Sequence, residues 1–112
     1  HIGLWLNGVS LYNTDDGQSF NNKSIWNRNS YYWEGFSFDN CDGHSDGMGE
    51  YHNHVHPKCM YSTSNTSHSP LIGFAFDGYP VYGPYAYSSS MNPLSSIKRV
   101  IGCYKERIFA NN

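Results

Sequence analysis

The stretch PLIGFAFDGYPVYGPYAY, residues 70–87, decides the fold. It contains two β-prone runs on either side of Asp77-Gly78, and a dipeptide of this type between two such runs is a strong signal for a β-hairpin. The same pattern occurs near the start of the chain, where LWLNGVSLY, residues 4–12, alternates apolar and polar residues around Asn7-Gly8. Two such hairpins predict a mainly β protein.

The stretches between the hairpins are rich in turn residues. NTDDGQSFNNKS (13–24) and DNCDGHSDGMG (39–49) are predicted to be polar loops, and residues 88–96 a Ser-, Asn- and Pro-rich linker. IWNRNSYYWEGFSF (25–38) is aromatic and β-prone, and its apolar residues lack a helical period. The closing segment, 95–109, fits either a strand or a short helix.

We therefore expect one mainly β domain over residues 1–112, built of short antiparallel strands and hairpins with long loops and little helix. At 112 residues the chain can bury a single core. Because it lacks a starting Met, we expect it to be a processed or partial form of a longer chain.

The composition excludes several classes of protein. Charged residues make up 14% and aromatic residues 17%, the opposite of a disordered chain. The net charge is −2, and the basic residues form no stripe beyond the pairs Lys98-Arg99 and Lys105/Arg107, so nucleic acid is not an expected partner. No apolar run approaches the roughly 20 residues that span a bilayer, so no membrane span is expected.

Cysteines and sequons point to an oxidising compartment. Cys41 and Cys59 are a plausible disulfide pair, and Cys103 is then left over. Asn22 and Asn65 each begin an Asn-x-Ser/Thr sequon in a polar stretch and are candidate sites of an N-linked glycan. Together these features favour an extracellular protein, either secreted or at the cell surface.

Three of the six histidines lie in GEYHNHVHPKCMY, residues 49–61. On a strand, His52, His54 and His56 share one face, with neighbours about 7 Å apart and the outer two about 13 Å apart. A straight strand can therefore offer only two of them to one ion. His44 and His68 are the candidates for further ligands.

An imidazole-rich ligand set suits zinc or copper. Calcium is a weaker alternative, because DGHSDG (42–47) resembles part of a calcium loop but Asn53 stands where its closing glutamate is expected. His1 could chelate copper through its ring and α-amine if it is a mature N-terminus. The histidines could also form a half-exposed strand face, hydrogen-bonded to tyrosines and backbone, without any metal.

GEYHNHVHP (49–57), followed by HSPLIGFAFDGYPVYGPYAY (68–87), resembles the YHYH-domain family, named for its Tyr-His-Tyr-His motif. The motif corresponds to Tyr51, His52, Asn53 and His54, with Asn53 in place of the family's second tyrosine. LNGV (6–9) and FDNCDGHSDG (38–47) extend the resemblance over roughly residues 3–87.

The resemblance implies a secreted or cell-surface protein with flanking sequence on both sides, in which Cys103 pairs with a cysteine outside this chain. It also strengthens the grouping of four histidines in one site: His44, His52, His54 and His68. It implies no catalytic activity.

These observations predict an extracellular, disulfide-stapled glycoprotein module with a histidine-lined metal site. Such a module would act in binding or structural assembly, with another copy of itself or another extracellular protein as partner, and a polymeric surface structure is one form that this assembly could take. The alternative is a zinc- or copper-dependent metalloenzyme. Asp77 could then act as a base but is better explained as a turn residue, and the aromatic runs 31–33 and 82–87 fit packing better than a sugar-binding platform.

Overall fold

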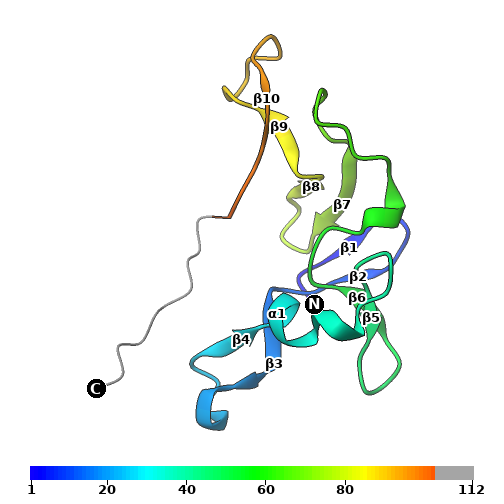
Figure 1. Ribbon diagram of the computed structural model, residues 1–112, viewed down its shortest axis with the longest axis vertical. Helices are drawn as coiled ribbons and strands as arrows, with labels where there is room; N and C mark the ends of the chain where they lie inside the picture. Colours follow the sequence, from blue (N-terminus) through cyan, green and yellow to red (C-terminus); the bar gives the residue numbers. More distant parts are fainter. Residues whose placement is uncertain (103–112) are drawn as a thin grey trace.

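The two hairpins form four adjacent strands of the larger sheet in the computed structural model, which describes residues 1–102 (Figure 1). Strands β1 (Gly3–Trp5) and β2 (Ser10–Leu11) flank Gly8, and β7 (Leu71–Ala75) and β8 (Pro80–Tyr82) flank Gly78. Both turn glycines have positive φ, 84° and 91°, which a side chain would disfavour. Both predicted hairpins are confirmed, and the chain is mainly β.

The six strands of this sheet lie in the order β5-β6-β2-β1-β7-β8, where β5 is His44–Ser45 and β6 is Tyr51–Asn53. Strand β1 joins the two hairpins by pairing antiparallel with β7. The pairing of β6 with β2 is parallel, in contrast to the antiparallel pairing expected for the domain, and places His52 opposite Ser10. This contact attaches the histidine segment to the sheet.

The apolar core among the described residues is small and is formed by residues of the hairpin strands. Its buried hydrophobic residues are Trp5, Leu11 and Ile72, with partly buried neighbours that include Val9 and Val81. Gly73 allows close packing of β1 on β7, because a Cβ there would lie 2.6 Å from the Leu4 carbonyl oxygen.

Residues 15–38, which we call the polar lobe, form a separate part of the chain beside the sheet (Figure 1). They comprise β3 (Asp15–Ser19), η1 (Phe20–Asn22), β4 (Asn27–Asn29), α1 (Ser30–Glu34) and η2 (Gly35–Ser37). Strands β3 and β4 pair antiparallel as their own small sheet. The buried residues of the lobe are Asp16 and Ser30, both polar.

Three local predictions were wrong. Residues 13–24 contain β3 and residues 39–49 contain β5, although both were expected to be loops. Residues 25–38 were expected to be β-prone, but most of them form α1 and η2. Helix α1 begins there because the Asn29 side chain accepts a hydrogen bond from the Tyr32 backbone N–H, which caps the helix start.

The remaining elements are one short helix and a second small sheet. The short helix η3 (Lys58–Met60) carries Cys59, which is disulfide-bonded to Cys41 as predicted. Strands β9 (Tyr85–Tyr87) and β10 (Ile97–Arg99) form a two-stranded sheet, so the closing segment begins as a strand. Cys103 lies outside the described residues.

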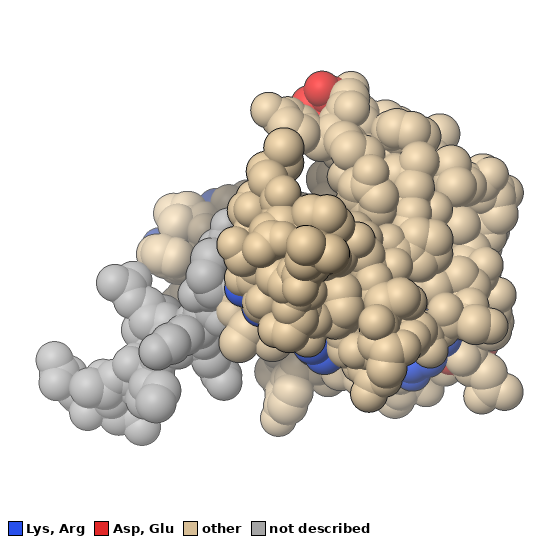
Figure 2. Space-filling view, turned by 90° about the horizontal axis from the view of Figure 1, so that it is seen from above, with Lys and Arg blue, Asp and Glu red and all other residues tan. Residues whose placement is uncertain are grey.

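The surface carries few charges, as Figure 2 shows for one face. Asn22 and Asn65, which begin the two sequons, are both exposed. Among the described residues, no helix is long and apolar enough to cross a membrane.

Candidate metal centre

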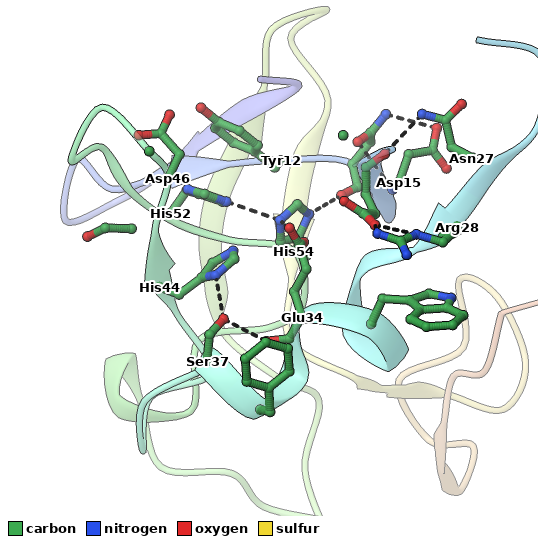
Figure 3. Close-up of a pocket in the computed structure, with 17 residues that line it drawn as sticks. Tyr12, Asp15, Asn27, Arg28, Glu34, Ser37, His44, Asp46, His52 and His54 are labelled. Atoms are coloured by element: carbon green, nitrogen blue, oxygen red, sulfur yellow. Dashed lines mark hydrogen bonds and ion pairs between the residues drawn. The ribbon is translucent and has the colours of Figure 1, made fainter. Parts of the chain in front are cut away.

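Three histidines converge where β5 and β6 meet the polar lobe (Figure 3). The antiparallel register of β5 and β6 places His44 directly opposite His52, and His54 follows β6 on the same side as His52. Their ligand atoms all lie within 4.8 Å of one another, and both His52 and His54 are buried. The predicted convergence of His44, His52 and His54 is therefore seen in the structure.

The hydrogen bonds of His52 and His54 fix which ring nitrogen carries the proton. His52 Nδ1 lies 3.0 Å from the Glu50 carbonyl oxygen, and His54 Nδ1 lies 2.6 Å from the Asn13 carbonyl oxygen. A carbonyl oxygen only accepts, so each Nδ1 is the donor and each neutral ring leaves Nε2 as a bare lone pair. These two Nε2 atoms face one another at 3.0 Å.

His44 is oriented in the same way by Ser37. The Ser37 hydroxyl donates its single hydrogen to the Glu34 carbonyl oxygen at 2.7 Å, so it must accept from His44 Nδ1, which lies 2.9 Å away. His44 Nε2 is buried and has no hydrogen-bond partner. A third lone pair therefore points into the same space.

Three neutral imidazoles with converging Nε2 atoms have the chemistry of a metal site. Zinc–nitrogen bonds of about 2.0–2.1 Å place tetrahedral ligands about 3.3 Å apart, close to the 3.0 Å between Nε2 of His52 and Nε2 of His54. The outward Nδ1–H bonds to oxygen acceptors are of the kind that orients metal-ligating histidines. Without an ion or an added proton, the facing lone pairs of His52 and His54 repel one another.

The environment of His44 disfavours the protonated form of its ring. Burial lowers the pKa of the His44 imidazole, and the nearby His52 and His54 rings lower it further. Since an imidazole binds a metal only in its neutral form, this shift favours binding at neutral pH.

The opposite side of β6 anchors the strand. The Tyr51 hydroxyl donates to Asp39 Oδ2 at 2.8 Å, and the Asn53 amide donates to the Asp42 carbonyl oxygen at 2.8 Å. Both side chains press against Gly43, where an added Cβ would lie 2.8 Å from Asn53 Nδ2. As the strand alternation predicts, Asn53 faces away from the imidazoles.

Tyr12 and Glu34 also adjoin the histidines, and the sequence did not reveal either. The Tyr12 ring stacks on His52 with centroids 3.9 Å apart and planes 18° apart. Glu34 Oε2, at the end of α1, lies 3.4 Å from His54 Nε2 and is buried without a hydrogen-bond partner. No spacing connects these residues to the histidine run, because Glu34 reaches it only through the unpredicted helix.

The histidines line an open cleft with a volume of about 830 Å³ between the polar lobe and the β5–β6 hairpin. Glu34, Ser37 and Tyr12 line the same cleft (Figure 3). The cleft therefore lies against the side chains of the three histidines and of Glu34.

His68 is not brought to this group. Its Nδ1 lies 2.7 Å from the Ser69 carbonyl oxygen, and its ring contacts Tyr82 and Tyr87 across the sheet from the other histidines. His56 also lies outside the group, as expected from its distance along the strand.

Other predicted features have local roles. Asp77 accepts a hydrogen bond from the Tyr79 backbone N–H at 3.4 Å, which supports its interpretation as a turn residue. In the calcium-like loop, Asp42 pairs with Lys58 at 2.7 Å, and Asp46 accepts from the backbone N–H groups of Met48 and Glu50. The His1 ring stands beside Tyr12, at the edge of the centre.

Comparison with protein-family models identifies the class of this mainly β, histidine-centred chain. Residues 1–111 match the family described as YHYH protein, and the chain therefore belongs to the YHYH family. The predicted resemblance is confirmed and extends over almost the whole sequence. No curated protein and no solved structure matches the chain.

Proposed function

We propose that this protein is an extracellular module that binds one zinc or copper ion through Nε2 of His44, His52 and His54. The observation that carries this proposal is the orientation of the three rings. Each Nδ1 proton is directed at an oxygen acceptor, and each Nε2 lone pair points into one space. Nitrogen ligands of this kind favour zinc and copper over calcium.

The extracellular location rests on the Cys41–Cys59 disulfide, since such bonds persist in oxidising compartments. The exposed Asn22 and Asn65 would carry N-linked glycans there without disturbing packing. The role is binding or structural assembly, with a second copy or another extracellular protein as partner. Among the described strands, β5 and β8 end the six-stranded sheet and are the places where another strand could pair.

Titration of the chelator-treated protein with Zn²⁺ and Cu²⁺ in a calorimeter tests the metal site. We expect one ion per chain, and loss of binding in His52→Ala and in His54→Ala. His56→Ala and His68→Ala are matched controls that should bind as the unchanged protein does. Absence of binding, or full binding by His52→Ala, would contradict the proposal and indicate that His52 and His54 share a proton instead.

A metalloenzyme is the second candidate function, and a specific observation favours it. The three histidines open onto a cleft that a small molecule can enter, whereas a purely structural ion is enclosed by protein ligands.

A further inference from the structure

Glu34 is placed beside the centre in a way that the metal site alone does not explain. Its Oε2 lies 3.4 Å from His54 Nε2, is buried, and accepts no hydrogen bond. A buried carboxylate oxygen without a hydrogen-bond donor is costly, so a cation or a proton donor beside His54 would stabilise this atom. The Ser37 hydroxyl donates a hydrogen bond to the Glu34 carbonyl oxygen, and its Oγ also accepts the hydrogen bond from His44 Nδ1 that orients this ring.

Glu34 does not belong to the compact group of ligand atoms formed by the three histidines. It lies to one side, next to His54, and faces the cleft. This is the position of a group that contacts the fourth ligand of the ion. In catalytic zinc sites that fourth ligand is a water molecule.

We propose that the centre is hydrolytic, with Glu34 as the general base, and that its substrates are neutral or positively charged esters or amides. This inference rests on the proposed metal binding. A zinc ion held by the three histidines would supply an activated water molecule. Glu34 would accept the proton of that water as its oxygen bonds to the substrate carbonyl carbon, and would return the proton to the leaving oxygen or nitrogen as the bond to the leaving group breaks.

The charge of the cleft determines the substrate class. Asp15, Asp46 and Glu34 line the cleft. Among the described residues that line it, Arg28 is the one Lys or Arg, and its Nε donates a hydrogen bond to Asp16 Oδ2 at 2.7 Å. With Asp16, four carboxylates line the cleft against one guanidinium and the divalent ion, which leaves a net charge of about −1. This negative charge disfavours phosphate and sulfate esters, whereas a neutral or cationic acyl compound can enter. Trp33 and Phe36 add exposed aromatic surface at the same cleft.

The test uses the zinc-loaded protein with p-nitrophenyl acetate as a neutral ester and p-nitrophenyl phosphate as an anionic one. We expect hydrolysis of the acetate and none of the phosphate. Glu34→Gln should lower kcat for the acetate by 10²-fold or more, because general bases contribute about 10²–10⁴-fold. Asp77→Asn removes the same charge in an exposed turn and should leave kcat unchanged.

Metal binding by the same variants separates this inference from the proposed function. Glu34→Gln should still bind one zinc ion with an affinity within about threefold of the unchanged protein, which also shows that it folds. A loss of affinity of 10-fold or more would make Glu34 a ligand and overturn its role as a base. Zinc binding without acetate hydrolysis would overturn the hydrolytic inference and leave the metal-binding proposal intact.

A second readout does not depend on activity. In the cobalt-loaded protein, the visible spectrum should change when acetohydroxamate, an uncharged acyl analogue, is added, because an accessible fourth position can accept it. The change should persist in Glu34→Gln. An unchanged spectrum would show that the coordination position is closed and would overturn the inference.

Discussion

The sheet and the polar lobe are held together by different interactions. The hairpin strands pack around Trp5, Leu11 and Ile72, all buried and apolar. The lobe, residues 15–38, buries only Asp16 and Ser30 among its described residues, and its large aromatic side chains Tyr32 and Phe36 are exposed. One region is stabilised mainly by the hydrophobic effect, and the other by directed polar contacts.

The polar contacts of the lobe lead to the histidine centre. Ser30 donates both its backbone N–H and its hydroxyl to the Thr14 carbonyl oxygen, at 2.9 and 3.0 Å. Ser37 contacts His44, and Glu34 lies beside His54. The centre therefore connects the two regions, and we call it the joint. The sheet edge provides the imidazoles, and the lobe provides some of the groups that orient them. A metal ion bound there would strengthen the joint.

The comparison predicts a large difference between two tryptophan substitutions. Trp5→Ala should lower the free energy of unfolding by about 3–5 kcal/mol, since it removes the largest of the three buried core side chains. Trp33→Ala, in the lobe, should cost much less because Trp33 is 48% exposed and contacts Arg28. Guanidinium denaturation measures both. Equal costs would contradict the distinction between the two regions.

The second prediction concerns the disulfide, which links the segment before β5 to the segment after β6. Replacing Cys41 and Cys59 together by serine should lower the free energy of unfolding by about 3 kcal/mol, through the greater freedom of the unfolded chain. Zinc affinity should fall as well, because Asn53 and Tyr51 would lose the rigid loop against which they pack. Denaturation and calorimetry with the paired variant measure the two effects. Unchanged zinc affinity would show that the centre is held from the lobe side alone.

The sequence predicts the sheet better than it predicts the contacts between the sheet and the polar lobe. The hairpins at Asn7-Gly8 and Asp77-Gly78 depend on neighbouring residues, and period two places His52 and His54 on one side, so these features are local and readable. Glu34 and Asn13 reach His54 through pairing between distant segments, which no local pattern encodes. Helix α1 has only five residues, too few to show a helical period. His68 is a candidate ligand by its residue type and its place before a hairpin, and the family resemblance strengthens its grouping with the other histidines, but no spacing fixes its position in space.

The third prediction tests the joint directly. Zinc at 100 times its dissociation constant should stabilise the folded chain by about 2.7 kcal/mol. Hydrogen exchange should slow most in α1, β5 and β6, where the ligands and their orienting groups lie, and little in the β9–β10 pair. His52→Ala should show no such response to zinc. Uniform protection across the sheet would contradict a local joint between the two regions.

The smallest expected effect comes from Tyr51, on the side of β6 away from the centre. Burial, followed by the hydrogen bond to Asp39, raises the pKa of the Tyr51 phenol to about 12. Because the folded-state pKa lies above the unfolded value of about 10, the contribution to stability is complete below pH 10 and is lost as the pH rises through 12. Tyr51→Phe should cost about 1 kcal/mol at neutral pH and remove this alkaline loss, with Tyr79→Phe, 72% exposed, as the control. Denaturation curves between pH 7 and about 11 measure both changes. An unaltered alkaline loss in Tyr51→Phe would show that another group causes it, and that the anchoring side of β6 depends on packing against Gly43 instead of on this hydrogen bond.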